Sequence, residues 1–335
     1  MVPRRVPQWE LRRVAPPTRF DSLTADVRPG PRCGLGDLTS ARLGIGSLGN
    51  RCKDQRMREF RGKTAVITGG ASGIGHAVAT RLGSEGMNLV IADIEQSALD
   101  LAVAEFEANG VSVLGQRTNV ADNDSIRALA AATNDRFGDV HVLFNNAGVA
   151  GGGPILEPDD IEVWNWVLGV DLMGVIYGIK AFGPQMIAHG EPCAIVNTAS
   201  MAGLLPTPSL GSYTVAKYGV VAVSEVLSLE TRDTTNLRVS VLCPGFVRTR
   251  IADSDRNIPE HLVSHTEPSE EQEFRREAVR DLIASGMPSS EVAQRVFEAI
   301  TEERFYILPH PQYGEQIVAR AQHIAAGGGV STWAI

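Results

Sequence analysis

Short apolar runs alternate along the chain with longer stretches in which apolar residues recur every three or four positions. The short runs are rich in β-branched residues, and several are apolar throughout, which is typical of strands covered on both faces of a sheet. The expected strands lie at 64–68, 88–92, 112–117, 140–144, 194–198, 238–242 and 305–308.

The longer stretches predict helices between these strands. They lie at 73–85, 96–109, 122–137, 159–189, 211–231 and 289–302. A regular alternation of strand and helix is the pattern of a doubly wound parallel sheet with helices on both faces. The sequence therefore predicts an α/β protein with a single sheet of about seven strands, spanning residues 57–310.

Two later segments do not follow the alternation. Residues 250–286 are polar and charged, and they come after the carboxyl end of a strand, where a lid over a substrate is expected. Residues 311–335 are expected to form a C-terminal tail.

The first 56 residues differ from the rest in charge and pattern. They hold 11 basic and 5 acidic residues, a net charge of +6, whereas residues 57–335 hold 20 and 34, a net charge of −14. They lack a sustained apolar period, which predicts a disordered extension. A nucleic-acid arm is disfavoured because the arginines are scattered, and a mitochondrial transit peptide because prolines prevent a long amphipathic helix. We hypothesise that Met57 is the physiological start, which mass spectrometry of the native N-terminus would test.

Composition narrows the classes of function. The acidic body disfavours nucleic acid and anionic membrane surfaces as partners. No run of about eighteen uninterrupted apolar residues is present, so no membrane span is expected. The four cysteines lack a C-x-x-C spacing, which predicts a reduced, intracellular protein in the cytoplasm. Cys193 and Cys243 lie at or beside apolar runs and are expected to be buried structural thiols.

A glycine-rich turn at 68–75 follows the first expected strand and opens the first helix. Glycines permit a tight turn and the close approach of a pyrophosphate, whose charge meets the free N–H groups of the helix. Contacts to a dinucleotide are expected from Gly69, Ser72, Gly73, Ile74 and Gly75.

An acidic residue, Asp93, ends the second expected strand about twenty positions after the glycines. Its carboxylate can accept hydrogen bonds from the ribose 2′- and 3′-hydroxyls and would repel a 2′-phosphate. This favours NAD over NADP as the cofactor. The alternative is that Asp93 is a plain turn residue at the end of a strand.

Tyr213 and Lys217 stand one helical turn apart, and Ser200 precedes the tyrosine by thirteen residues. A phenol, with an ordinary pKa near 10, needs a neighbouring cation to act as an acid/base catalyst at neutral pH, and the lysine can supply one. The spacing alone also fits a surface pair on a helix. Ser200 lacks the G-x-S-x-G context of a nucleophile, which favours a role in binding.

The glycine turn, the stretch 145–148, Ser200, Tyr213-x-x-x-Lys217 and Pro244-Gly245 occur in the order that resembles the short-chain dehydrogenase/reductase family across about residues 60–310. The resemblance implies a Rossmann-type fold and hydride transfer between a secondary alcohol or ketone and NAD. It assigns Tyr213 as acid/base and Lys217 as the group that holds the nicotinamide ribose and lowers the tyrosine pKa. Ser200 would orient the substrate oxygen.

The same resemblance assigns further cofactor contacts. The segment after the third strand would hold the adenine, the stretch after the fourth would border its ribose, and the segment after the sixth would fix the nicotinamide carboxamide. The residues concerned are Asn119, Val120, Asn146, Ala147, Gly148, Pro244, Gly245, Val247 and Thr249. Asn119 is a mild departure, because Asp is commoner in the family there.

Asp171 is a second departure, because the family often has an asparagine there that supports a proton relay through water to the lysine. An ionised acid cannot donate a hydrogen bond, and its charge near Lys217 would raise the pKa of the lysine. We hypothesise that Asp171 keeps a supporting catalytic role and that the relay differs.

Alternatives to this function are an NADP-preferring carbonyl reductase and a dinucleotide-binding regulatory protein without turnover. The expected partner is a small, largely apolar alcohol or ketone, and the resemblance implies a homodimer or homotetramer. His261 and His265 share a helical spacing, but no third ligand is suitably placed, so no metal site is expected.

Overall fold

The computed structural model describes residues 56–151, 153–156, 161–262 and 270–330. The predicted N-terminal extension lies outside the described residues except for Arg56. The packed core begins at Met57 and Phe60, which are 4% and 5% exposed.

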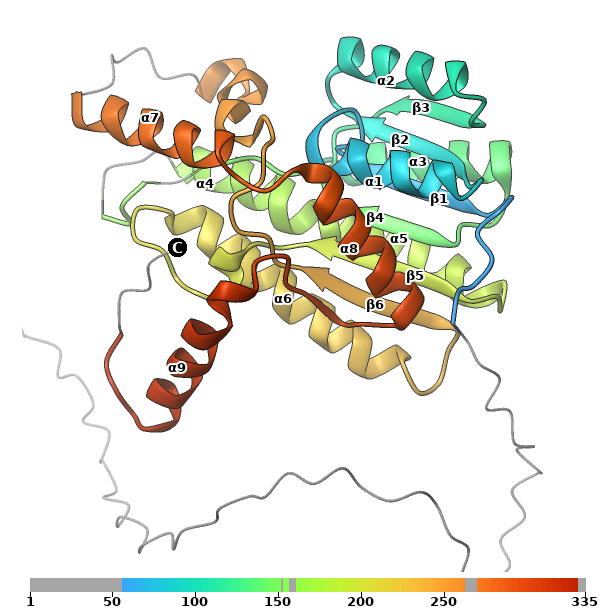
Figure 1. Cartoon of the computed structure of the whole chain (residues 1–335). Helices are drawn as coiled ribbons and strands as arrows, with labels where there is room; N and C mark the ends of the chain where they lie inside the picture. The colour runs from blue at the N-terminus through green and yellow to red at the C-terminus, as the bar shows by residue number, and fades with distance from the viewer. Residues whose placement is uncertain (1–55, 152, 157–160, 263–269, 331–335) are drawn as a thin grey trace, which may run out of the picture. The chain divides into compact units, whose positions relative to one another are not determined.

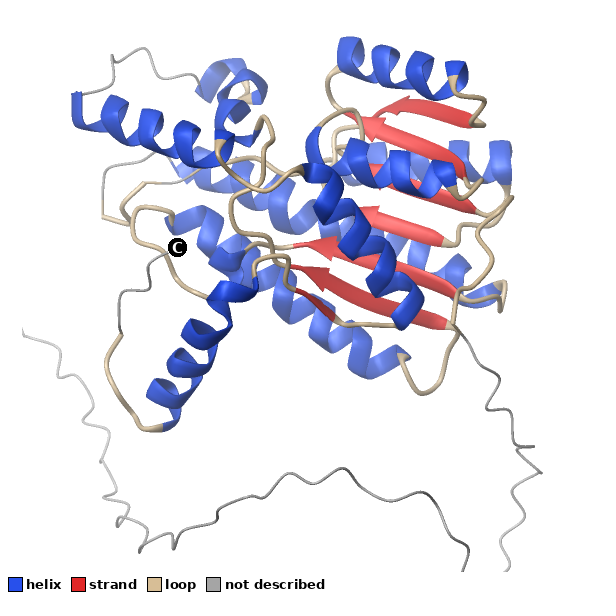
Figure 2. Ribbon diagram, in the orientation of Figure 1, coloured by secondary structure: helices blue, strands red, loops and turns tan. Residues whose placement is uncertain are grey.

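Seven parallel strands form one sheet in the order β3-β2-β1-β4-β5-β6-β7 (Figure 2). Their bounds are β1 Thr64–Thr68, β2 Asn88–Asp93, β3 Val113–Arg117, β4 Val142–Asn145, β5 Cys193–Thr198, β6 Leu237–Leu242 and β7 Tyr306–Ile307. In the centre of the sheet Val66 of β1 pairs with Val90 of β2 and Leu143 of β4. The expected α/β class with a doubly wound parallel sheet is confirmed.

Helices cover both faces of this sheet (Figure 1). They are α1 Gly73–Ser84, α2 Gln96–Ala108, α3 Asn123–Phe137, α4 Ile161–Leu168, α5 Gly174–Ala188, α6 Gly211–Thr231, α7 Glu270–Ala284, α8 Ser289–Glu302 and α9 Gly314–Ala325. Apolar residues of α1, α2 and α8 form a core against one face, and those of α3, α5 and α6 pack on the other. Helices on both faces explain why the strand sequences are apolar throughout.

The helix expected at 159–189 is interrupted. A π-helical turn, η1 Gly169–Met173, joins α4 to α5. Among the described residues, the stretch Ile161–Ala188 is 28 residues long with a mean hydropathy of 1.4 in its most apolar window, so by length and composition alone it could cross a membrane. Core helices of soluble proteins meet the same criteria, and here α4 packs on α6 while α5 packs on α3 and the sheet.

The expected lid and tail contain helices that the sequence pattern did not reveal. The segment after β6 forms two short 3-10 helices, η3 Ile251–Asn257 and η4 Glu260–Leu262, followed by α7. The segment expected as a tail contains a 3-10 turn, η5 Pro311–Tyr313, and α9. The sequence pattern did not predict α7 because this helix is almost wholly exposed, and an exposed, polar helix lacks the apolar stripe that marks a helix in sequence.

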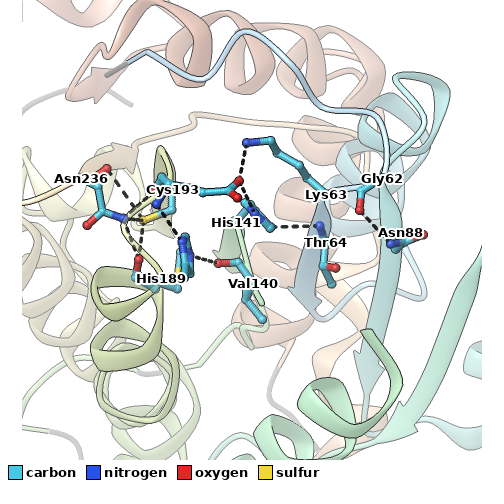
Figure 3. A network of polar contacts seen from close by, with 11 residues as sticks. Gly62, Lys63, Thr64, Asn88, Val140, His141, His189, Cys193 and Asn236 are labelled. Atoms are coloured by element: carbon cyan, nitrogen blue, oxygen red, sulfur yellow. Dashed lines mark hydrogen bonds and ion pairs between the residues drawn. The ribbon is translucent and has the colours of Figure 1, made fainter. Parts of the chain in front are cut away.

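A polar network lies at the amino ends of β1, β4, β5 and β6 (Figure 3). We call it the amino-edge network, and it comprises Lys63, His141, His189, Glu191 and Asn236. Glu191 accepts from Lys63 Nζ and from His141 Nε2, each at 3.2 Å. The amide of Asn236 donates to the backbone carbonyl oxygens of Met186 and Glu191. The network therefore joins the segments that enter four strands.

Candidate active site

The predicted site residues meet at the opposite, carboxyl edge of the sheet. Strand order reverses between β1 and β4, and a ligand of a doubly wound sheet is expected at the carboxyl ends of the strands on either side of such a reversal. The turn after β1, the stretch after β4 and the N-terminal part of α6 all lie at this edge.

Tyr213 and Lys217 lie one turn apart on α6, as the sequence predicts. Lys217 is 2% exposed, and its Nζ lies 5.3 Å from the centre of the Tyr213 ring. The same Nζ donates to the carbonyl oxygen of Thr198 at 3.3 Å. Ser200 caps η2 (Met201–Gly203) by accepting from the N–H of Ala202 at 3.1 Å, and its hydroxyl lies close enough to the Tyr213 phenol to lower the pKa of that phenol.

Asp171 joins this set from the π-helical turn η1, a feature that is frequent at functional sites. It is fully buried, and its Oδ1 accepts from the N–H of Val149 at 2.8 Å. Its Oδ2 lies 3.2 Å from Lys217 Nζ and has no hydrogen bond of good geometry. The acid that replaces the family's asparagine thus forms a direct, buried ion pair with the lysine.

The surroundings of Tyr213 and Lys217 shift the pKa values of both side chains. Burial raises the pKa of Tyr213 above its ordinary value, and the Asp171 carboxylate adds to the rise; the Lys217 charge and the Ser200 hydroxyl oppose it. Lys217 therefore lowers the pKa of Tyr213, as expected, but its effect is smaller than that of burial, and the net shift is upward. Burial lowers the pKa of Lys217, but Asp171 and Tyr213 together outweigh burial and raise it. The lysine stays protonated at neutral pH.

The glycine turn is built for close approach of the backbone. Gly69 and Gly73 have φ of 61° and 56°, a conformation that favours glycine. A Cβ on Gly75 would lie 2.1 Å from the carbonyl oxygen of Gly69. The Asn146 amide donates to the carbonyl oxygens of Thr68 and Gly69 at 3.1 and 3.2 Å, which ties the turn to the end of β4.

The first turn of α1 leaves N–H groups available to an anion. Ser72 precedes the helix in an extended conformation and makes no side-chain capping bond. The first four N–H groups of a helix have no partner within it, and the helix dipole favours a negative charge there. Together with the open glycine backbone, this end of α1 fits the pyrophosphate of a dinucleotide.

Asp93 lies beside the same turn, where the sequence places it. Its Oδ2 accepts from the N–H of Ala71 and its Oδ1 from the N–H of Glu95, each at 3.1 Å. Burial raises the pKa of Asp93, while these backbone N–H groups lower it. A carboxylate has about four lone-pair sites, so these bonds leave capacity for two ribose hydroxyls.

The segment 244–249 faces the glycine turn from the other side. A Cβ on Gly73 would meet Thr249 Cγ2 at 3.1 Å, and Val247 is 4% exposed and bridges to Met287. A cavity of about 610 Å³ lies at this junction. Its lining residues are Ser72, Gly73, His76, Ala77, Arg248, Thr249, Arg250, Ala252, Asp253, Arg280, Ile283, Ala284 and Ser289.

The remaining predicted residues differ in what they contact. Gly148 lies beside the Asp171–Lys217 ion pair, because a Cβ there would be 3.4 Å from Asp171 Oδ1 and 3.5 Å from Lys217 Nζ. Asn119 is exposed, and its Oδ1 accepts from the N–H of Ala121 at 3.1 Å, so this oxygen caps its own turn. Val120 beside it is buried. Ile74 and Ala147 pack on the two cores.

Two contacts that the sequence pattern did not reveal tie η3 across the site. The Ser254 hydroxyl accepts from the N–H of Ala150 at 2.9 Å, just after the stretch 145–148. At the other end, Arg256 and Asn257 donate to Glu95 Oε1 at 2.8 and 3.0 Å, two residues after Asp93. We call these the lid contacts. They join residues more than 100 positions apart, and no local spacing signals them.

The described residues contain no group of three or more metal-ligating side chains. His261 pairs with Glu162 at 3.8 Å, whereas His265 lies outside the described residues. Both cysteines that the structure describes, Cys193 and Cys243, are free and buried, as expected.

Comparison with known proteins agrees with the geometry. A family model for short chain dehydrogenases matches residues 63–259. A CLA biosynthesis dehydrogenase/reductase of Lactiplantibacillus plantarum is 32% identical over 276 residues, covering 81% of this chain and 96% of that protein. A cyclohexanol dehydrogenase of Acinetobacter sp. (strain SE19) is 35% identical over 191 residues, covering 57% of this chain and 75% of that protein.

Among solved structures, a short chain dehydrogenase/reductase from Burkholderia phymatum in complex with NAD has a TM-score of 0.80 and 42% identity, and the match covers 83% of this chain and 100% of that one. The chain therefore belongs to the short-chain dehydrogenase family, whose members are NAD(P)-dependent oxidoreductases that act on CH–OH groups.

Proposed function

We propose that the protein interconverts a secondary alcohol and a ketone with NAD, using Tyr213 as the acid/base. The observation that supports this most directly is the arrangement around the Tyr213 phenol. A buried lysine ammonium lies beneath its ring, and the nearby Ser200 hydroxyl lowers the pKa of the phenol. A helix surface pair would need neither the burial nor the counter-ion Asp171.

When bound, the nicotinamide supplies the hydride acceptor in oxidation and the hydride donor in reduction. The chain's own groups manage the proton and the substrate. In oxidation the Tyr213 phenolate takes the hydroxyl proton, and in reduction the phenol returns it to the carbonyl oxygen. Ser200 holds that oxygen by a hydrogen bond, and the Lys217 ammonium stabilises the phenolate.

Asp171 has a supporting role in this proposal. It balances the charge of Lys217 and fixes the position of its Nζ, while its other oxygen holds the backbone of Val149. Because its carboxylate also raises the pKa of Tyr213, it raises the pH at which the phenolate forms.

The dinucleotide would lie along the carboxyl edge of the sheet. The glycine turn and α1 would bind its pyrophosphate, Asn119 and Val120 its adenine, and Asp93 and the stretch 145–148 its adenosine ribose. Lys217 would hold the nicotinamide ribose, and segment 244–249 the carboxamide. Support for this path comes from the uncapped N-terminus of α1 and from the contact between Thr249 and Gly73.

Asp93 supports NAD as the preferred cofactor, because its remaining lone pairs fit ribose hydroxyls and its charge would repel a 2′-phosphate. NADP is the second candidate, since Arg248, Arg250 and Arg280 line the cavity beside the glycine turn. Asp93→Ser separates the two. We expect the variant to lose preference for NAD, by about tenfold or more; unchanged preference would remove Asp93 from the argument.

We propose a largely apolar substrate because the segments after β5 and β6 carry the half-buried apolar side chains of Leu204 and Ile251. The cyclohexanol dehydrogenase relative supports a small secondary alcohol. The deciding experiment is a panel of secondary alcohols and ketones with NAD(H) and NADP(H), followed by the absorbance of the reduced nicotinamide. Turnover of no member of the panel, with tight NADH binding retained, would instead support a regulatory role.

A homodimer or homotetramer in the cytoplasm is also part of the proposal. The exposed apolar residues Val215, Val226 and Leu229 on α6 support burial of this helix between subunits. Light scattering of the purified protein tests it, and a monomeric mass at micromolar concentration would contradict it.

A further inference from the structure

His310 is a buried histidine that the proposed chemistry does not use. It lies three residues after β7 and just before η5, in the region that the sequence pattern assigned to the end of the domain. Its side chain is 7% exposed. A buried imidazole at the edge where the site lies calls for an account of its two ring nitrogens.

Both ring nitrogens are bonded to the backbone of the segment 244–249. The N–H of Gly245 donates to Nδ1 at 3.0 Å, and Nε2 lies 3.1 Å from the carbonyl oxygen of Phe246. Because Nδ1 must accept and Nε2 must donate, the ring is the neutral tautomer with its proton on Nε2. One side chain thus binds backbone groups of two successive residues, Gly245 and Phe246.

The residue at 245 shows how closely the ring is applied. A Cβ on Gly245 would lie 2.9 Å from Tyr313 Cε2 and 3.2 Å from His310 Cγ. Gly245 is not among the glycines with positive φ, so close approach, rather than backbone conformation, requires a glycine. His310 and Tyr313 together leave no room for a side chain at position 245.

His310 also borders a cavity. This cavity of about 340 Å³ is lined by His310, Phe246, Pro309, Arg295 and Tyr313, among others.

The gripped segment leads directly into the proposed cofactor site. The carbonyl oxygen of Pro244 accepts from the N–H of Met201 at 2.9 Å, next to Ser200. Three residues after Phe246, Thr249 contacts the glycine turn at Gly73. A shift of the backbone at 245–246 would therefore reach both the Ser200 loop and the residues expected to hold the carboxamide.

We infer that His310 is a positioning residue for the dinucleotide: its two bonds hold segment 244–249 in the conformation that presents Val247 and Thr249 to the nicotinamide. This inference rests on the proposed function. It adds a residue beyond the family-matched region 63–259, so the part of the chain after β7 contributes to cofactor binding.

The tautomer makes this grip sensitive to acid. A proton on Nδ1 would turn this atom from an acceptor into a donor, and it would then face the N–H of Gly245, which is also a donor. The groups that face the ring are Arg295 of α8 and Tyr313 of η5. Burial and the Arg295 charge lower the pKa of His310, so the ring is neutral at pH 7 and becomes charged only in acid.

The test measures NADH binding by fluorescence in the full-length protein at about pH 7.5 and about pH 5. His310→Ala removes both bonds and is expected to weaken NADH binding about tenfold at the higher pH. His310→Asn keeps an acceptor near the Nδ1 position and does not titrate. We expect it to bind nearly as the wild type at the higher pH and to lose less affinity in acid than the wild type does.

His189→Asn is the matched control, because His189 has the same bonding pattern in the amino-edge network. Its Nδ1 accepts from the N–H of Glu191 at 3.1 Å, and its Nε2 lies 3.0 Å from the carbonyl oxygen of Val140 (Figure 3). This variant should bind NADH as the wild type does at both pH values, with the same loss in acid.

Wild-type affinity in His310→Ala would overturn the inference while leaving the proposed function intact. If His310→Ala fails to fold, the asparagine variant decides, since a loss in acid equal to that of the wild type would overturn the inference. A wild-type protein that binds neither NADH nor NADPH would overturn the proposed function and this inference with it.

Discussion

A lysine–carboxylate pair lies at each edge of the sheet, and the two pairs differ in their access to solvent. At the amino edge, Lys63 and Glu191 are 18% and 58% exposed. At the carboxyl edge, the side chains of Lys217 and Asp171 are 3% and 0% exposed. The two pairs have the same separation of 3.2 Å, so burial, not distance, distinguishes them.

Burial changes what such a pair does. An exposed pair contributes about 0–1 kcal/mol to stability. Two buried charges lose several kcal/mol of hydration each, so a buried pair is weak evidence for stability and needs another reason to be present. At the carboxyl edge we propose that this reason is the effect of the pair on the Tyr213 pKa, whereas the amino-edge network joins the segments that enter the strands.

The largest expected effect comes from removing the acid/base at the carboxyl edge. Tyr213→Phe should lower kcat by about 10²–10⁴-fold and leave NADH binding nearly unchanged, because only the proton-transferring hydroxyl is lost. Tyr218→Phe is the matched control on the same helix, where the hydroxyl donates to the carbonyl oxygen of Leu204 at 2.9 Å. Equal losses in the two variants, measured as initial rates, would contradict the assignment.

The next effect concerns the buried carboxylate. Since ionised Asp171 raises the pKa of Tyr213, Asp171→Asn should lower it and move the acid limb of alcohol oxidation to lower pH. Glu191→Gln changes the corresponding acid at the amino edge and should leave the profile in place. Profiles of kcat/KM for both variants check this, and an unmoved limb in Asp171→Asn would show that the carboxylate does not tune the phenol.

A converse effect is expected at the amino edge. His189→Ala removes two hydrogen bonds and should lower the free energy of unfolding by about 2 kcal/mol, with kcat unchanged in the folded protein. Urea titration combined with initial rates measures both quantities. A loss of kcat without a loss of stability would contradict the view that the amino edge serves stability and the carboxyl edge serves catalysis.

Acid should weaken the amino edge through His141. Burial, with the charge of Lys63, lowers the pKa of His141 below its ordinary value of 6.5. Its contribution to stability is therefore full above pH 6.5 and is lost as the pH falls from there through the folded-state pKa. Unfolding free energies at a series of pH values test this, and His141→Gln should reduce the slope below pH 6.5.

The smallest effect is expected at the lid contacts. Glu95 and Arg256 are 23% and 26% exposed, so this pair should contribute about 1 kcal/mol at most. Glu95→Gln should speed NADH release a few-fold at low salt, and less at high salt because ions screen the wild-type pair. Stopped-flow measurements of release at two salt concentrations decide, and an unchanged rate would show that η3 does not retain the cofactor.

Local sequence patterns predicted the sheet and the spacing of Tyr213 and Lys217, because both depend on residues that are close in sequence. The apolar run of β1 and the one helical turn that separates Tyr213 from Lys217 are of this kind. The π-helical turn at Asp171 was not foreseen, since η1 shares the composition of the helices on either side. The grip of His310 on Gly245 joins residues 65 positions apart, and only the folded chain brings them together.

The central claim is that the carboxyl edge transfers hydride to NAD with Tyr213 as the base. The most direct measurement uses secondary alcohols, cyclohexanol among them, deuterated at the carbinol carbon, with mass spectrometry of the cofactor. Deuterium should appear in the reduced nicotinamide with the wild-type protein and be reduced by about 10²-fold or more with Tyr213→Phe. Transfer at the wild-type rate in Tyr213→Phe, or no transfer from any alcohol to bound NAD, would contradict the claim.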